Sequence, residues 1–147
     1  MCNEVALVYA VNTHEEGNLI LGTQTNTDLE SDTKTQKLLN DKDENICILI
    51  HNHPTDSSFS IEDYAEFMLY AKLKVMVAVT NSGQQYFMTK TERTDVALAF
   101  LKAIEKHGYE GMFYASKVDM ELEKSWEVSR IEEEYKIWVA QYPALPY

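Results

Sequence analysis

The stretch from Ile46 to Asp63 constrains the fold of this chain more than any other part of the sequence. It opens with the apolar run Ile-Cys-Ile-Leu-Ile, which is typical of a buried strand, and continues directly into His-Asn-His-Pro. Because Pro54 has no N–H group, it cannot extend a hydrogen-bonded ladder, so the strand is expected to end there. Ser60 then begins a capping box ahead of apolar residues at helical spacing. The sequence therefore predicts a strand, a short loop and a helix in direct succession.

The two histidines of this stretch have the spacing of a metal-binding pair. Residues i and i+2 of a strand point to the same face, so His51 and His53 can bind one metal ion. Asp63, in the first turn of the following helix, could return a carboxylate to the same point. Two imidazoles, one carboxylate and an open fourth position describe a catalytic zinc site. A helix cap alone would explain Ser60 and Asp63, but it would not explain two histidines at the end of a buried strand.

The order His-x-His-Pro, a short polar loop and Ser-x-x-Asp resembles the signature of the JAMM/MPN+ (JAB) zinc metalloprotease superfamily. The wording His-Asn-His-Pro is most similar to its bacterial RadC-like branch and to related domains on phage and mobile elements. The resemblance implies that His51, His53 and Asp63 bind zinc, with water as the fourth ligand. It also implies that Ser60 forms a hydrogen bond to this water or to the tetrahedral intermediate.

The same resemblance requires an upstream glutamate as general base, and Glu4 matches the RadC-like placement of that residue. The alternative for Glu4 is an exposed carboxylate at a strand edge. Glu15 and Glu16 are its rivals, but they lie in a predicted hairpin turn and are expected to face solvent. Glu4 also lies almost at the chain start, where chain ends fray unless other contacts hold them. The resemblance covers roughly residues 4–90.

The function implied by the resemblance is that of a zinc metallopeptidase that cleaves a peptide or isopeptide bond, with Glu4 moving the proton to the leaving amine. Its substrate would be a protein or peptide, such as a ubiquitin-like tail or a phage or mobile-element protein. Asn52 and the loop over residues 56–58 lie where substrate could approach, although a polar turn explains them equally well. Two alternatives stay open: an inactive MPN-like module that binds a partner, and a RadC-like mobile-element protein that acts near DNA.

Composition narrows the range of partners. With 147 residues, of which 45% are hydrophobic and 25% charged, the chain resembles one ordinary globular domain. Its formal net charge of −11 argues against nucleic acid as a partner, because phosphate contacts need clustered Lys and Arg. No apolar run is long enough to span a bilayer and no secretory signal is recognisable, so we expect a cytoplasmic location. Cys2 and Cys47 define no disulfide framework, and Cys47 is expected to be a buried thiol.

The remaining patterns predict an α/β (α+β) fold, which the resemblance completes as a mixed sheet sandwiched by helices. Residues 1–92 are expected to form the hydrolase core, and residues 93–147 a helical extension packed on it as part of one compact unit. Short apolar runs bounded by turn residues indicate strands, and apolar residues three to four positions apart indicate helices. We expect strands over 5–11, 18–23, 46–51, 75–80 and 84–89, helices over 61–73, 94–106 and from 119 to about 141, and either a helix or an ordered loop over 27–40.

Overall fold

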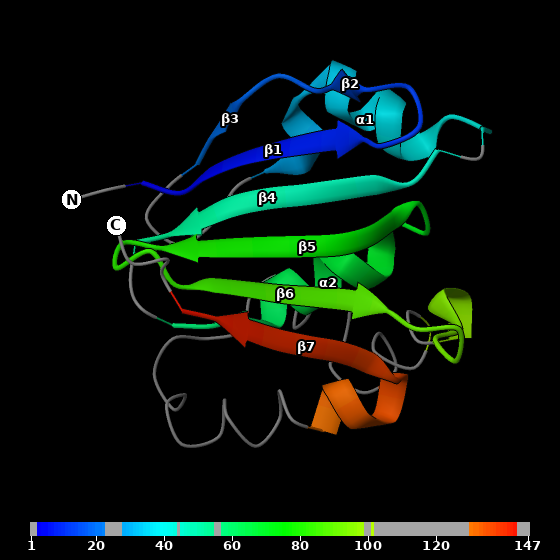
Figure 1. The fold of residues 1–147 in the computed structure, drawn as a ribbon. Coiled ribbons are helices and arrows are strands. Elements are labelled where there is room, and N and C mark those ends of the chain that lie inside the picture. Colours follow the sequence, from blue (N-terminus) through cyan, green and yellow to red (C-terminus); the bar gives the residue numbers. More distant parts are fainter. Residues whose placement is uncertain are drawn as a thin grey trace.

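A mixed sheet organises the protein in the computed structural model, which describes residues 3–22, 28–43, 45–54, 57–98, 101 and 130–143. The strands follow the order β2-β1-β4-β5-β6-β7, and β3 also pairs with β1 (Figure 1). The strands are β1 (Val5–Ala10), β2 (Glu15–Glu16), β3 (Ile20–Leu21), β4 (Cys47–His53), β5 (Leu73–Thr80), β6 (Gln85–Lys90) and β7 (Ile137–Tyr142). The helices that accompany them are α1 (Thr33–Asn40) and α2 (Ile61–Leu69), with a short 3-10 turn, η1 (Leu29–Ser31). The predicted α+β class is therefore confirmed.

Strand β4 lies in the middle of this sheet, antiparallel to β1 and parallel to β5. Its alternate residues Cys47, Leu49, His51 and His53 are buried, as expected for a strand with one face on the core. Parallel strands need a crossover connection, and α2 supplies it between β4 and β5. This crossover brings the start of α2 close to the C-terminal end of β4, where the predicted site lies.

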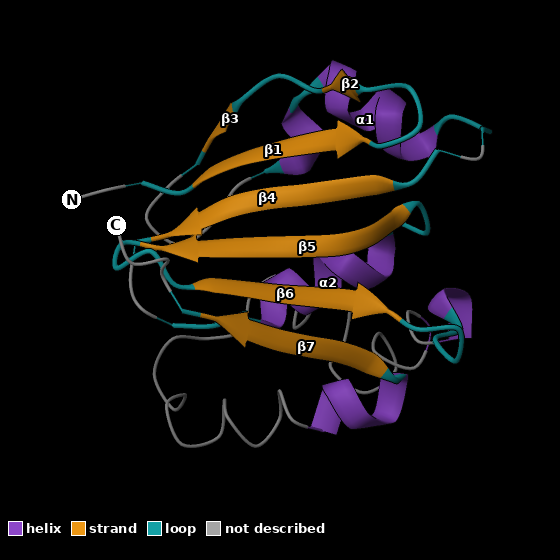
Figure 2. Cartoon of the chain, in the orientation of Figure 1, coloured by secondary structure: helices purple, strands orange, loops and turns teal. Residues whose placement is uncertain are grey.

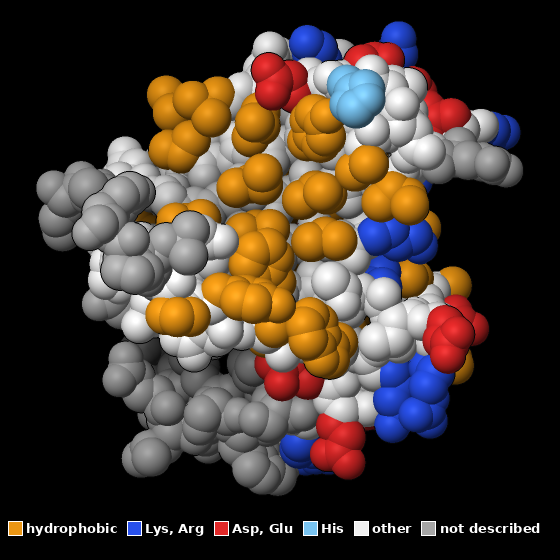
Figure 3. Space-filling model, viewed as in Figure 1, with side chains coloured by type: hydrophobic (Ala, Val, Ile, Leu, Met, Phe, Trp, Pro, Cys, Tyr) orange, Lys and Arg blue, Asp and Glu red, His pale blue; other side chains and the backbone are white. Residues whose placement is uncertain are grey.

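Both α1 and α2 cover the same face of the sheet (Figure 2). They share one hydrophobic core, and Gln36 of α1 donates a hydrogen bond to the Tyr70 hydroxyl beside α2 at 3.1 Å. The opposite face is largely apolar and open to solvent over the described strands, with Ile50 and Trp138 among its exposed residues (Figure 3). In the part of the chain that the structure describes, α1 and α2 therefore cover one face of the sheet (Figure 2).

The N-terminal hairpin is confirmed, but its second strand is divided. Both β2 and β3 pair antiparallel with β1, and they are separated by a segment that contains Gly17. Gly17 lies against α1, because a Cβ atom there would come within 2.3 Å of Thr35 Oγ1. Its amide still donates to the Val8 carbonyl at 2.9 Å. The hairpin is thus interrupted where α1 packs against it.

The largest correction concerns the C-terminal part of the chain. The predicted helix from 119 to about 141 is wrong over Ile137–Tyr142, which form β7 and pair antiparallel with β6. Lys136 has a left-handed backbone (φ 58°), which ends the preceding helical residues 130–135. The expected helical extension therefore contributes a strand to the sheet of the core. Residues 119–129 and most of the helix predicted over 94–106 lie outside the described residues.

Two smaller differences concern helices. The helix predicted over 61–73 ends at Leu69, because Tyr70 has an extended backbone and β5 begins at Leu73. The segment predicted as a helix or an ordered loop over 27–40 contains η1 and α1. In the described ranges, no helix has the length and apolar character needed to cross a membrane.

Candidate metal centre

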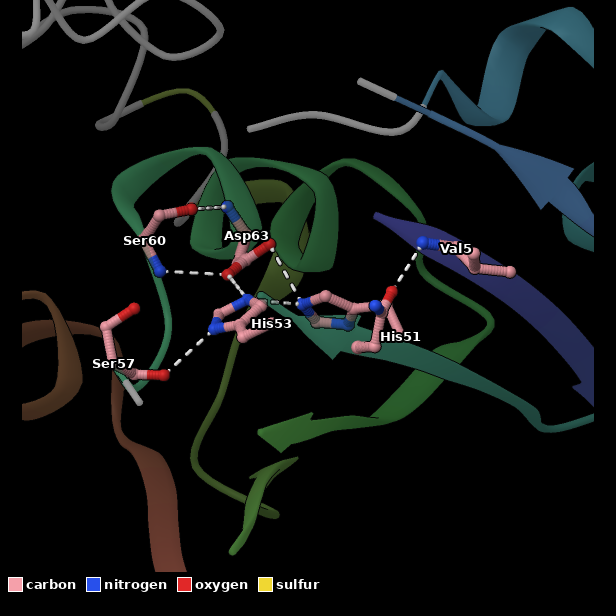
Figure 4. Close-up of polar contacts among 7 residues, drawn as sticks. Val5, His51, His53, Ser57, Ser60 and Asp63 are labelled. Atoms are coloured by element: carbon pink, nitrogen blue, oxygen red, sulfur yellow. Dashed lines mark hydrogen bonds and ion pairs between the residues drawn. The ribbon is translucent and has the colours of Figure 1, made fainter. Parts of the chain in front are cut away.

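The predicted ligands meet where β4 ends and α2 begins (Figure 4). His51 and His53 project from the buried face of β4 and are 3% and 5% exposed. Asp63 lies in the first turn of α2 and is 8% exposed. Each of the three side chains can offer one ligand atom, and these atoms lie within 4.8 Å of one another. The three residues therefore form a buried group that could hold a metal ion.

The separations between the ligand atoms fit a single small ion. His51 Nε2 lies 2.8 Å from His53 Nε2 and 3.3 Å from Asp63 Oδ1, and His53 Nε2 lies 3.2 Å from Asp63 Oδ2. Tetrahedral ligands with bonds of about 2.0–2.1 Å are separated from one another by about 3.3 Å. Two imidazole nitrogens and one carboxylate oxygen are also a donor set that zinc accepts. The two distances to Asp63 join different carboxylate oxygens, so the ligand atoms lie close enough to hold one metal ion, and their chemistry is one that zinc accepts.

The imidazole rings are oriented by different means. His53 Nδ1 lies 2.9 Å from the Ser57 carbonyl oxygen, which favours a proton on Nδ1 and leaves Nε2 to act as a ligand. His51 Nδ1 is buried and has no hydrogen-bond partner among the described residues. The His51 ring instead packs against His53, with ring centroids 4.6 Å apart, and against Phe59, with centroids 6.3 Å apart. One ligand is therefore held by a carbonyl and the other by packing.

Asp63 is both a helix-capping residue and a candidate ligand. Its backbone N–H donates to Ser60 Oγ at 3.2 Å, and Ser60 N–H donates to Asp63 Oδ2 at 2.8 Å. This is a complete capping box, and it fixes the carboxylate while leaving it directed at the histidines (Figure 4). The two interpretations of Ser-x-x-Asp are therefore compatible in this structure. The role of Ser60 toward a bound water stays a prediction.

The field around the histidines favours positive charge. Burial raises the pKa of Asp63, but the charges and hydrogen bonds of His51 and His53 outweigh it and hold the pKa well below its usual range. Burial lowers the pKa of His53, but the hydrogen bond to Asp63 outweighs it and raises the pKa to about 9. A carboxylate that stays ionised next to two imidazoles is what a divalent cation requires.

Glu4 lies beside the same group. The antiparallel register pairs Ala6 with His51, so Glu4, two residues earlier, falls opposite His53 and on the same face. It is 9% exposed, which excludes the alternative of a solvated carboxylate at a strand edge. Burial, and next to it the charge of Asp63, raises the pKa of Glu4 to about 7. The structure therefore brings a carboxyl group with a near-neutral pKa to the candidate ligands.

Glu15 and Glu16, the alternatives to Glu4 as general base, and Cys47 lie away from the candidate metal centre. Glu15 and Glu16 form β2 and are both exposed, as predicted. Cys47 begins β4, at the end away from the histidines, and its thiol donates a hydrogen bond of 3.6 Å to the Leu38 carbonyl. The prediction of a buried thiol is confirmed for Cys47. Cys2 lies outside the described residues.

Two contributors to the site could not be recognised from sequence patterns. The carbonyl of Ser57 orients His53, and a backbone carbonyl carries no signal in the residue type. Asn52 forms hydrogen bonds to the backbone of Asn3 and Val5, and its position where substrate could approach stays a prediction. Its position between the two histidines was the available signal, although its partners depend on the pairing of two distant strands. Residue 56, from the other predicted substrate contact, lies outside the described residues.

Comparisons with protein-family models, curated proteins and solved structures give no match to this chain. The resemblance to the JAMM superfamily therefore rests on the motif that carries it, and it stays a prediction.

Proposed function

We propose that this chain is a zinc-dependent metallopeptidase that hydrolyses a peptide or isopeptide bond with a zinc-activated water. The observation that supports this most strongly is the convergence of Glu4 with His51, His53 and Asp63 on one buried face, from segments far apart in the sequence. Three ligand atoms and a separate carboxyl group are the parts that metal-assisted hydrolysis needs.

Nε2 of His51, Nε2 of His53 and one carboxylate oxygen of Asp63 would hold the ion. Zinc bound there would lower the pKa of its water and polarise the scissile carbonyl. Glu4 is suited to accept the proton of this water and to pass it to the leaving amine, because its buried carboxyl group lies opposite His53 on the face that carries the candidate ligands. The burial of Glu4 also strengthens its electrostatic interactions with groups at the site.

Ser60 would stabilise the oxyanion that develops on the substrate carbonyl. Its hydroxyl oxygen accepts a hydrogen bond from Asp63 N–H, and a serine hydroxyl in that position keeps its own proton for donation. A single donor of this kind typically lowers the barrier by about 3–4 kcal/mol. The capping box holds this hydroxyl next to the metal ligands.

The substrate class follows from the motif resemblance. We propose a protein or peptide substrate in the cytoplasm, such as a ubiquitin-like tail or a phage or mobile-element protein. The net charge of −11 favours a partner with a basic surface over nucleic acid. An inactive MPN-like binding module and a RadC-like protein acting near DNA remain the alternatives that the experiment must separate.

The first experiment measures the metal content of purified protein by elemental analysis. Wild type is expected to hold about one zinc per chain, and His53→Ala and Asp63→Ala are expected to lose it, because each removes one of three ligands. Glu4→Gln is the matched control: it is expected to retain zinc and to lose hydrolysis of peptide and isopeptide substrates. Wild type that neither contains zinc nor takes it up would reject the metallopeptidase. Zinc-loaded wild type without hydrolysis would favour the binding module. A salt-sensitive complex with DNA would favour the RadC-like alternative.

A further inference from the structure

The backbone around Glu4 is held by a side chain at the point where the strand ladder stops. The register between β1 and β4 ends at the pair Ala6–His51, so Glu4 lies beyond the last pair. Past that pair, Asn52 bonds to both neighbours of Glu4. Its Oδ1 accepts a hydrogen bond from the N–H of Val5 at 2.5 Å, and its Nδ2 donates one to the Asn3 carbonyl at 3.2 Å. The amide thus holds the chain on either side of Glu4.

The other edge of this segment is held as well. Gly22 N–H donates to the Glu4 carbonyl at 2.8 Å, next to the last pair between β1 and β3. Bonds from Gly22 on one side and Asn52 on the other therefore fix the direction in which the Glu4 side chain leaves the backbone. The Asn52 side-chain amide supplies one donor and one acceptor, so it can form the two hydrogen bonds that a residue of a paired strand would form through its backbone.

Asn52 lies between His51 and His53 in the sequence, but its side chain is on the opposite face of β4. Successive residues of a strand point to opposite faces, and Asn52 is half-buried whereas His51 and His53 are buried. Its side chain is also occupied by the bonds to Asn3 and Val5. Replacing Asn52 therefore leaves the three ligand atoms and their orienting contacts in place.

We propose that Asn52 is a positioning residue, which holds Glu4 at the metal site by its two bonds to the flanking backbone. This inference rests on the proposed function for its catalytic consequence, but the contact itself is independent of it. Without the amide, the segment ahead of Ala6 loses its attachment to β4, and the Glu4 carboxyl departs from the position needed for proton transfer. A displacement of about 1 Å can lower a rate by about 100-fold.

The test compares Asn52→Ala and Asn52→Asp with Ile50→Ala. Ile50 is the matched control, because it lies on the same strand and face and is exposed. Hydrogen exchange of the Val5 amide is expected to rise about tenfold or more in Asn52→Ala, which removes its acceptor. The rise should be smaller in Asn52→Asp, which keeps that acceptor but has no donor for the Asn3 carbonyl. In Ile50→Ala the exchange should match wild type.

The catalytic readouts use zinc-loaded protein. Asn52→Ala is expected to retain about one zinc per chain and to lower kcat by about 10–100-fold with little change in KM, because only the general base moves. In a Glu4→Gln background the same substitution should no longer change the residual rate. Unchanged exchange at Val5, loss of zinc, or an undiminished effect without the Glu4 carboxylate would overturn the proposal. Wild type that holds zinc and cleaves nothing would defeat the proposed function alone, since the exchange measurement still decides whether Asn52 holds the segment.

Discussion

At the scale of single residues, a half-buried lysine shows how its surroundings change the protonation of a side chain. This residue is Lys90, at the end of the sheet away from the candidate metal centre. Its ammonium group donates to the Tyr70 carbonyl at 2.7 Å and lies 4.6 Å from the centroid of the Phe67 ring. Burial, aided by the charge of Lys74, lowers the pKa of Lys90 from 10.5 to about 7. The folded protein therefore binds the proton of this amine less readily than the unfolded chain does.

This difference predicts how stability depends on pH. Between about pH 7 and pH 10.5 the unfolded state carries more protons on Lys90 than the folded state, so the free energy of unfolding rises with pH. Relative to Lys90→Met, wild type is expected to gain on the order of 1–2 kcal/mol between about pH 7 and about pH 9. Urea denaturation at both pH values measures it. Lys37→Met, which removes an exposed charge, should keep the wild-type dependence, and an equal slope in Lys90→Met would contradict the prediction.

Gly17 gives a second prediction at this scale. A methyl group there would meet Thr35 Oγ1, which is buried and donates to Asp32 Oδ2 at 2.6 Å. Asp32 is the N-cap of α1, so the clash would disturb the start of that helix. Gly17→Ala is expected to destabilise the protein by about 1–3 kcal/mol in denaturant unfolding. The effect should shrink in a Thr35→Ala background, where the hydroxyl is absent, and equal effects in both backgrounds would show that the clash is not the cause.

At the scale of elements, the helix over residues 130–135 is attached to the core through α2. The Tyr64 hydroxyl donates a short hydrogen bond to Glu132, and Ile131 and Tyr135 are buried. Burial and this bond to Glu132 raise the pKa of Tyr64 well above its ordinary range. The contact joins the crossover helix of the site to the segment that leads into β7.

Loss of that hydroxyl should weaken the attachment. Tyr64→Phe is expected to lower the free energy of unfolding by about 1–3 kcal/mol, because the partly buried Glu132 carboxylate loses its donor. Amide exchange over Ile137–Tyr142 should also become faster. Tyr86→Phe is the control, since the Tyr86 hydroxyl donates a hydrogen bond to the nearby Gln84 Oε1 at 3.2 Å. Equal effects of the two substitutions would contradict a specific role for the contact with Glu132.

The elements also show where sequence patterns suffice. His51 and His53 follow a continuous apolar run and are two residues apart, so the strand, the shared face and the possible metal-binding group could be predicted from local spacing. Trp138 and Val139 fit a helical stripe as well as a strand, and the pairing with β6 decides in favour of the strand. Asn52 could not be assigned, because its partners depend on the register of β1 against β4. Local periodicity predicts elements, whereas contacts between distant strands decide the remaining details.

At the scale of the whole molecule, the metal group joins two elements of the core. His51 and His53 belong to the central strand, and Asp63 begins the crossover helix. An ion bound by all three would have no equivalent site in the unfolded chain, so binding would stabilise the fold. With free zinc at about 100 times its dissociation constant, the gain would be about 2.7 kcal/mol.

Metal removal therefore gives a prediction for the whole molecule. Adding zinc to chelator-treated wild type is expected to raise Tm by several degrees, roughly 4–8 °C for about 2–3 kcal/mol. Chelator should reverse the rise. Asp63→Ala should show no shift, and Glu4→Gln should respond as wild type does, because Glu4 is outside the ligand set. Differential scanning calorimetry measures all four responses, and a zinc-dependent shift that persists in Asp63→Ala would place the ion elsewhere.

Glu4 is far along the chain from the three candidate ligands, and this separation affects how the site assembles. The three candidate ligands lie within residues 51–63, so only a short loop closes when they meet. Glu4 joins them only when β1 has paired with β4, which closes a longer loop. Closing the longer loop costs about 1 kcal/mol more. In the proposed enzyme, metal binding and proton transfer would therefore depend on separate segments of the chain.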